Sequence, residues 1–292
     1  FIFGLFGAPK MGVSGVALAT AISHGISAFL ILKTLISARD VYRLQLKKLS
    51  VDFTIFKEML KIGIPAGVQS SCFAVSNMII QSSINSFGSL AMAGTTAVLG
   101  LEGIVYVGSY AFHQTAISFV AQNLGGRKFK RILKSLYGCF LCAAGCCLIM
   151  GLGFYFAGEF LLAVFNPDPN VIAWGMLRMK ILFTTYVLCG IMDVASGGLR
   201  GLGYSLLSAV ISFLGACAFR VWWVFAVFPH YRTMENLMLS YPISWLLVAV
   251  VSGGLLYWIC RRMIRSHCAR SVAWSKLGPG VPRGFRYLGG PK

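Results

Sequence analysis

The sequence predicts an all-α polytopic membrane protein with about seven transmembrane helices. Hydrophobic residues make up 57% of its 292 positions, and only 12% of the residues are charged. Soluble domains carry about 25% charged residues, so a water-soluble globule of this composition would lack the polar side chains needed to cover its surface. The many aromatic residues argue against intrinsic disorder, and the glycines follow no collagen-like repeat.

Seven apolar runs each have the length of a membrane crossing. A helix needs roughly 20 mostly apolar residues to cross a hydrocarbon layer about 30 Å thick. The runs lack the alternation typical of a β-barrel wall, and a helix satisfies all backbone hydrogen bonds within its own segment. We therefore expect helices at residues 12–35, 62–87, 101–122, 133–156, 171–197, 206–228 and 237–260.

The basic residues lie mainly on one side of these runs. Three inner loops and the tail hold 21 of the 26 Lys and Arg residues, whereas the opposite side holds only Lys10 and Arg232. The positive-inside rule then places the C-terminus in the cytoplasm. The net charge of +18 is thus explained by membrane orientation, and we expect no nucleic-acid partner. The basic segments are residues 33–61 and 127–134, the turn at Arg200 and the tail from Arg261.

Three short segments resemble the multidrug and toxic compound extrusion (MATE) family, whose members export drugs in exchange for protons or sodium. They are residues 12–20 (GVSGVALAT), residues 122–128 (QNLGGRK), and Met192-Asp193 followed by residues 197–203 (GGLRGLG). They look like the start of the family's sixth helix, the inner end of its eighth and the end of its tenth. The resemblance covers about residues 12–263 and implies one six-helix lobe of a two-lobe transporter.

This resemblance divides the chain into four parts. The odd number of spans and the external start without Met lead us to expect that the first five helices of the N-terminal lobe are missing. After the capping residue Asp52, an amphipathic helix is expected on the membrane surface, with Gly63 and Pro65 at entry to the next span. The parts are the last N-lobe helix (1–36), a cytoplasmic linker (37–61), the six-helix C-lobe bundle (62–260) and a basic, disordered cytoplasmic tail (261–292).

Two polar stripes run along the second and third apolar runs, where amide and aromatic side chains recur every four residues. A carboxamide that faces lipid lacks hydrogen-bond partners, at a cost of a few kcal/mol. We expect both stripes to line a water-filled substrate cavity, with interhelical hydrogen bonds as the alternative. The candidate cavity residues are Gln69, Phe73, Asn77, Gln81, Tyr106, Tyr110 and Gln114.

Charged residues inside the runs form a second set of candidates, because ionisable groups in a membrane are functional by default. Asp193 is placed about four residues from the inner end of its helix, where it either relays protons or bonds Ser196 or nearby backbone. Glu102 lies near the outer end of the third run, somewhat shallower than Arg178 and Arg220. We hypothesise that Glu102 pairs with one of these arginines as an external gate. The candidate coupling or gating residues are Asp193, Glu102, Arg220 and Arg178.

We expect neither a metal site nor an organic cofactor. Of the four cysteines 139, 142, 146 and 147, a helix brings Cys139, Cys142 and Cys146 close together, but the surrounding sequence is wholly apolar and offers no supporting hydrogen bonds to metal ligands. The coupling ion implied by the resemblance is H⁺ or Na⁺.

The expected function is secondary active efflux of small cationic or amphiphilic compounds by alternating access, in the plasma (inner) membrane and without enzymatic activity. The expected partners are small-molecule substrates, the lipid bilayer and the missing N-lobe. A lipid-linked saccharide flippase is the main alternative, although it would favour more Arg and Lys in the groove. A polytopic membrane enzyme would need converging acids or histidines, and a structural membrane subunit is the remaining possibility.

Overall fold

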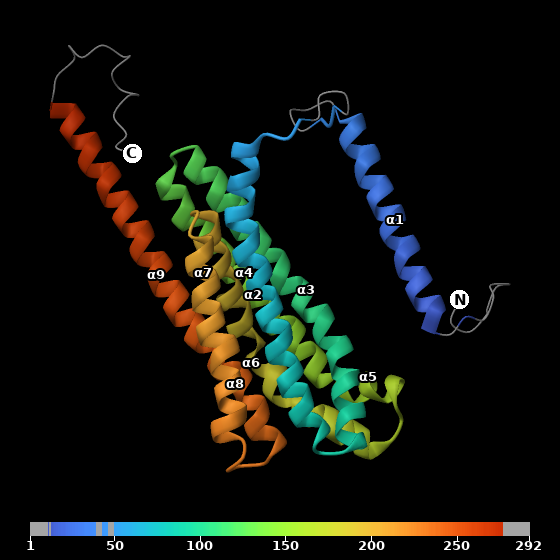
Figure 1. Ribbon diagram of the computed structural model, residues 1–292. Helices are drawn as coiled ribbons and strands as arrows, with labels where there is room; N and C mark the ends of the chain where they lie inside the picture. The colour runs from blue at the N-terminus through green and yellow to red at the C-terminus, as the bar shows by residue number, and fades with distance from the viewer. Residues whose placement is uncertain (1–10, 12, 39–42, 46–49, 277–292) are drawn as a thin grey trace. The chain divides into compact units, whose positions relative to one another are not determined.

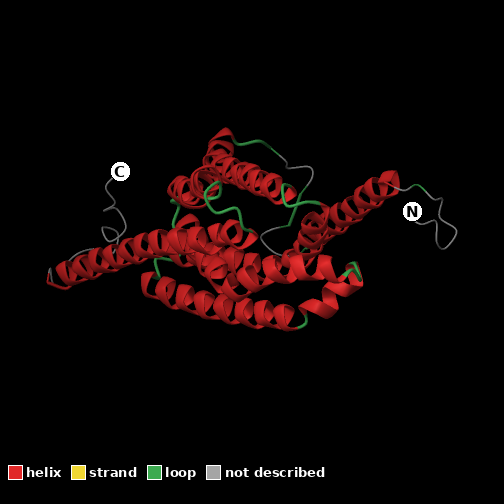
Figure 2. Ribbon diagram, turned by 90° about the horizontal axis from the view of Figure 1, so that it is seen from below, coloured by secondary structure: helices red, strands yellow, loops and turns green. Residues whose placement is uncertain are grey.

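The computed structural model describes residues 11, 13–38, 43–45 and 50–276, with side chains in the last helix as far as Arg265. Within these ranges the chain consists of helices and loops, with no strand (Figure 2). The all-α fold class is therefore confirmed. The predictions for Lys10 and for residues 277–292 of the tail lie outside the described residues.

The chain forms two compact units, Phe1–Lys57 and Glu58–Lys292. The first unit contains α1 (Val13–Ser37), an apolar helix long enough to cross a membrane. Its two threonines are satisfied locally, because Thr20 and Thr34 donate hydrogen bonds to the carbonyl oxygens four residues earlier, at 2.9 and 2.8 Å. This leaves an outer surface of apolar side chains, such as Phe29, that suits a lipid environment.

The second unit is a bundle of long helices whose connections alternate between two ends (Figure 1). Its first long helix begins in the last residues of the first unit. The elements are α2 (Phe53–Asn85), α3 (Ser89–Gly125), α4 (Phe129–Phe156), α5 (Gly158–Phe165), α6 (Pro169–Gly201), α7 (Ser205–Ser212), α8 (Phe219–Trp222) and α9 (Met234–Lys276). The π-helical segment η3 (Phe213–Ala218) joins α7 to α8, and a second one, η4 (Trp223–Val227), follows α8, so that the four form one continuous helical stretch.

Six helices in the described part of the chain are long and apolar enough to cross a membrane, namely α1, α3, α4, α6, the α7–η4 stretch and α9. Helix α2 is equally long but less apolar, because it carries the amide residues of the predicted polar stripe. It would be the seventh crossing in the predicted set of about seven. The helices generally extend beyond the apolar runs, since a helix continues into the polar sequence at the membrane surface.

Two features at the helix ends differ from the predictions. The predicted amphipathic surface helix is the first part of α2, which continues through Pro65 without ending. Asp52 does cap it, accepting a hydrogen bond from the Thr54 backbone N–H at 2.8 Å. The predicted disordered tail is helical as far as Lys276, because α9 continues beyond the apolar run.

Helix α6 is the centre of the bundle and packs against α3, α4 and α9. Glycines allow the backbones of α3 and α6 to approach closely, as small residues commonly do in membrane helices. A Cβ atom at Gly197 would lie 2.6 Å from the carbonyl oxygen of His113, and one at Gly201 would lie 2.8 Å from that of Ile117. On α3, a Cβ at Gly94 would meet the Val171 carbonyl oxygen at 2.5 Å.

Replacing Gly197 by Ala is expected to destabilise the bundle by about 1–3 kcal/mol, the usual cost of overpacking. The added methyl group would meet a backbone carbonyl, which cannot rotate away. Gly254→Ala in α9 is the matched control, because nothing lies within 4 Å of a Cβ at that position. Thermal unfolding of the purified protein in detergent measures the difference. Equal unfolding midpoints for the two variants would contradict the close α3–α6 contact.

Candidate functional site

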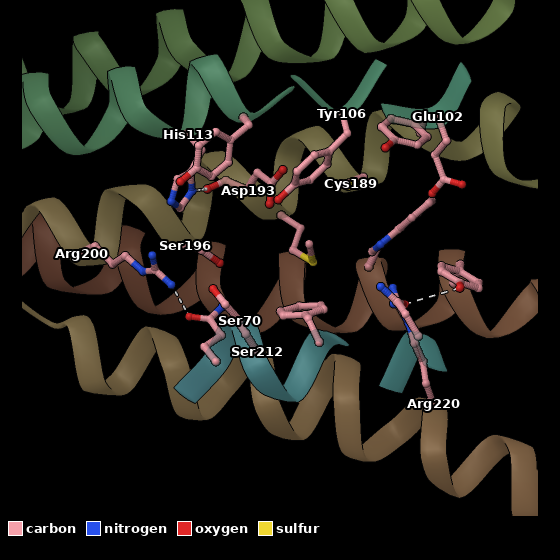
Figure 3. A pocket seen from close by; sticks show the side chains of 18 residues that line it. Ser70, Glu102, Tyr106, His113, Cys189, Asp193, Ser196, Arg200, Ser212 and Arg220 are labelled. Carbon is pink, nitrogen blue, oxygen red and sulfur yellow. Dashed lines mark hydrogen bonds between the residues drawn. The ribbon is translucent and has the colours of Figure 1, made fainter. Parts of the chain in front are cut away.

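A cavity of about 190 Å³ lies inside the bundle of the second unit, among α2, α3, α6, α7, α8 and α9. Figure 3 shows the side chains that line it. Five of the seven predicted cavity residues and three of the four predicted charged residues are among them. These eight residues are Gln69, Phe73, Asn77, Tyr106, Tyr110, Glu102, Asp193 and Arg220.

Three predicted residues lie outside the lining. Gln81 donates a hydrogen bond to Asn85, four residues along the same helix, and Gln114 donates to the Tyr110 hydroxyl, also four residues away. These amides are partly satisfied along their own helices. Arg178 is buried behind the cavity wall, where it pairs with Glu102.

Asp193 lies in the cavity wall and bonds to α3. Its Oδ2 accepts a hydrogen bond of 2.9 Å from Ser109, not from Ser196 as the sequence suggested. Its helix also continues eight residues further, to Gly201, so at 1.5 Å per residue the carboxylate is about 12 Å from the helix end. The helix thus ends four residues beyond the predicted end, and the depth of Asp193 in the membrane stays a prediction. Asp193 is thus a carboxylate deep in an apolar bundle with a neutral hydrogen-bond donor.

His113 joins this end of the cavity. Its Nδ1 lies 2.7 Å from the backbone oxygen of Asp193. Since a carbonyl oxygen can only accept, Nδ1 carries the proton, and Nε2 is the nitrogen that remains to accept or take up a proton. The imidazole stacks on Tyr110, with ring centroids 5.4 Å apart, and Tyr110 stacks in turn on Tyr106 at 5.9 Å. These aromatic faces next to a carboxylate form an environment suited to cations.

A polar link between α6 and α2 also lies at this end. The guanidinium of Arg200 donates a hydrogen bond to the side-chain oxygen of Gln69, and both residues line the cavity. The sequence interpretation counted Arg200 as a residue of an inner turn. It belongs instead to the last turn of α6, and its long side chain reaches back into the bundle.

Glu102 and Arg178 form the ion pair on the opposite side of the cavity. Arg178 Nη2 lies 2.7 Å from Glu102 Oε2, and the side chains are 2% and 17% exposed. Of the two arginines proposed as partners, Glu102 therefore contacts Arg178. Helix α3 begins at Ser89 and not near residue 101, so Glu102 lies inside the helix and not at its start.

Arg220 is 2% exposed and makes only neutral contacts within the described residues. Its Nε donates to Ser244 Oγ at 2.9 Å, and its Nη1 lies 3.4 Å from Asn77 Oδ1. The guanidinium carbon lies 4.2 Å from the centroid of the Tyr241 ring. Nη2 has no hydrogen-bond partner in the part of the chain that the structure describes.

The sequence interpretation missed several residues of the lining. Tyr241 and Trp245 lie four residues apart on α9 and face the cavity together, but aromatic residues at that spacing are also typical of a packed core. Tyr186, Cys189 and Met192 on α6 have equally ordinary apolar spacing. The other lining residues that were not predicted are Ser70, His113, Ser196, Arg200 and Ser212.

Replacing Glu102 by Gln is expected to destabilise the protein, because Arg178 would keep its buried charge without a partner. Breaking such a pair costs about 3–5 kcal/mol. Glu159→Gln is the control, since Glu159 is an exposed acid in α5. The double variant Glu102→Gln/Arg178→Gln should recover part of the loss. A Glu102→Gln protein that unfolds at the same temperature as Glu159→Gln would contradict the importance of this pair.

No three His, Cys, Asp or Glu side chains come close enough to hold a metal ion in the part of the chain that the structure describes. The four cysteines of α4 are free thiols. The absence of an organic cofactor stays a prediction.

The fold and site define a polytopic helical membrane protein with a polar cavity enclosed by its helices. The sequence pattern of the MatE family matches residues 65–224, which is more than half of the chain. The chain belongs to this family, whose members are transporters and not enzymes. The resemblance to the MATE family is therefore confirmed, and the matched range includes two of the three short segments, residues 122–128 and Met192-Asp193 with residues 197–203.

Curated relatives and solved structures agree with this assignment. The chain is 24% identical over 231 residues to the probable multidrug resistance protein NorM of Thermotoga maritima, a match covering 79% of this chain and 50% of that protein. It is 28% identical to the NorM protein of Neisseria meningitidis serogroup A, covering 92% and 59%. A crystal structure of a MATE protein in complex with MaL6 has a similar fold, with a TM-score of 0.79 at 17% identity, covering 90% of this chain and 60% of that one.

The chain spans about half the length of the curated relatives it matches. Its similarity to the solved structures establishes the fold of the matched part.

Proposed function

We propose that the full-length protein containing this sequence exports small cationic or amphiphilic compounds across the plasma membrane. Transport proceeds by alternating access, coupled to a gradient of H⁺ or Na⁺. The helices of the second unit form one lobe, which moves against an N-terminal lobe of the same protein. The C-terminus lies in the cytoplasm, as the distribution of basic residues favours.

The observation that supports this proposal best is the composition of the cavity wall. A carboxylate, Asp193, lies deep in an apolar bundle beside His113 and the stacked rings of Tyr106 and Tyr110. Aromatic faces and a carboxylate attract organic cations. The same carboxylate can take up a proton or bind Na⁺, and competition between ion and substrate for one group couples their movements. Helical transporters commonly bind substrate between two repeats at mid-membrane.

Asp193→Asn is expected to slow gradient-driven export strongly while leaving the fold intact, because the amide can still bond to Ser109. Coupling energies of about 1–3 kcal/mol correspond to roughly 5- to 150-fold effects, so we expect a loss of this size in initial rate. The assay follows export of ethidium from proteoliposomes that contain the full-length protein, under an imposed pH or Na⁺ gradient. Glu159→Gln removes an acid outside the cavity and should transport normally. Undiminished export by Asp193→Asn would contradict the role of this carboxylate.

The proposal assigns an external gate to the Glu102–Arg178 pair. This pair joins α3 to α6 beside the cavity, so its separation would loosen the contact between the two helices. Export by Glu102→Gln in the same proteoliposomes tests the assignment. Rates and pH dependence equal to those of the unmodified protein would exclude a gating role.

The lipid-linked saccharide flippase remains the second candidate, and one observation favours it. Two basic side chains, Arg200 and Arg220, line the cavity, and such groups would bind a pyrophosphate. Translocation of a fluorescent lipid-linked saccharide by the same proteoliposomes, without export of ethidium, would support this second candidate over drug export.

A further inference from the structure

Arg220 is a buried cation held by neutral side chains, with no carboxylate in contact among the described residues. Ser244 and Asn77 are neutral acceptors, and the Tyr241 ring covers one face of the guanidinium. These contacts orient the side chain, but they do not neutralise it. Nη2 remains without a partner, although the residue is 2% exposed and lines the cavity.

The two acids that line the cavity, Glu102 and Asp193, each interact with another residue. Glu102 pairs with Arg178 at 2.7 Å, and Asp193 accepts a hydrogen bond from Ser109. In Figure 3, Arg220 lies toward one end of the cavity, whereas His113, Ser196 and Arg200 lie toward the other. Among the described residues, no carboxylate comes within 4 Å of the Arg220 guanidinium. Glu102 lies toward the same end of the cavity as Arg220 in Figure 3, but it forms its ion pair with Arg178. Arg220 therefore has no carboxylate within ion-pair distance among the described residues.

An unpaired charge buried in an apolar bundle is costly, so its presence calls for a compensating group. The helix around Arg220 is also unusual, because this residue lies in α8, a single α-helical turn with a π-helical segment on each side. Such π-helical segments occur frequently at functional sites. Burial, the N–H group without a partner among the described residues, and the local helix geometry all indicate that Arg220 binds a ligand that enters the cavity.

We propose that Arg220 binds the carboxylate of a transported substrate, so that the cavity accepts amphiphilic compounds that carry an aromatic acid group. A carboxylate oxygen would accept a hydrogen bond from Nη2 and supply the missing negative charge. Phe73 and Trp245 line the same cavity and provide apolar walls for an aromatic ring. This inference rests on the proposed export function and specifies its substrate class.

The test compares benzoate with benzamide, which has nearly the same shape but no charge. Binding to the purified full-length protein is measured by isothermal titration calorimetry. Benzoate should bind roughly 10- to 100-fold more tightly, the range expected for a hydrogen bond to a charged group. Arg220→Gln should remove this preference, whereas Arg232→Gln, which removes an exposed arginine outside the cavity, should retain it.

Several results would overturn the proposal. One is equal binding of benzoate and benzamide by the unmodified protein, a comparison that does not depend on how well any variant folds. Another is an unchanged preference in Arg220→Gln. Phosphate or chloride that displaces benzoate at equal concentration would assign the position to an inorganic anion, which also contradicts a substrate carboxylate.

The outcome is separable from that of the proposed function. Ethidium carries no carboxylate, so its export from proteoliposomes reports on transport independently of Arg220 binding an acid. If ethidium is exported but benzoate binds no more tightly than benzamide, the efflux function is supported and the carboxylate site is excluded. If benzoate binds more tightly than benzamide but no compound is exported, the carboxylate site is supported and the efflux function is contradicted.

Discussion

The need of every buried polar group for a partner determines how this bundle is organised. Hydrocarbon offers no hydrogen bonds, so a polar side chain in a membrane helix must find its partner on the same or another helix. Here Ser109 donates a hydrogen bond to Asp193, Arg178 forms an ion pair with Glu102, and Gln69 accepts a hydrogen bond from Arg200. Each of these contacts joins two helices. The polar groups thus gather inside the bundle, and the cavity forms where they meet.

Side-chain size determines where the helices pack closely and where a space remains between them. Helices α3 and α6 meet through glycines, which leave no room between the two backbones. Helix α2 is reached by long side chains instead, namely those of Arg200, Arg220 and Tyr241. Such side chains bridge a larger gap than glycine does. The cavity therefore lies between α2 and the tightly packed part of the bundle, and Asp193 and Arg220 are exposed to it from α6 and α8.

The sequence predicted the fold class and the polar face of α2, because hydropathy and helical periodicity act within one segment. It could not predict the helix ends, since Ser89 and Lys276 lie in helices that extend past the apolar runs. Nor could it predict which partner a polar group finds across the bundle. Gln81 bonds within its own helix, and Arg200 points inward from what looked like a turn. These choices depend on the three-dimensional packing, which no local pattern contains.

The central claim is that the polar side chains face water inside the bundle. Single cysteines at adjacent positions 77 and 78, introduced into a full-length protein whose native cysteines have been replaced, test it most directly. Asn77 lines the cavity, whereas the Met78 side chain is 72% exposed on the outer surface, which we place in lipid. A membrane-impermeant, charged methanethiosulfonate reagent should modify the cysteine at 77 in the full-length protein and leave the one at 78 unmodified. An unreactive cysteine at 77, or equal reaction at both positions, would contradict the account.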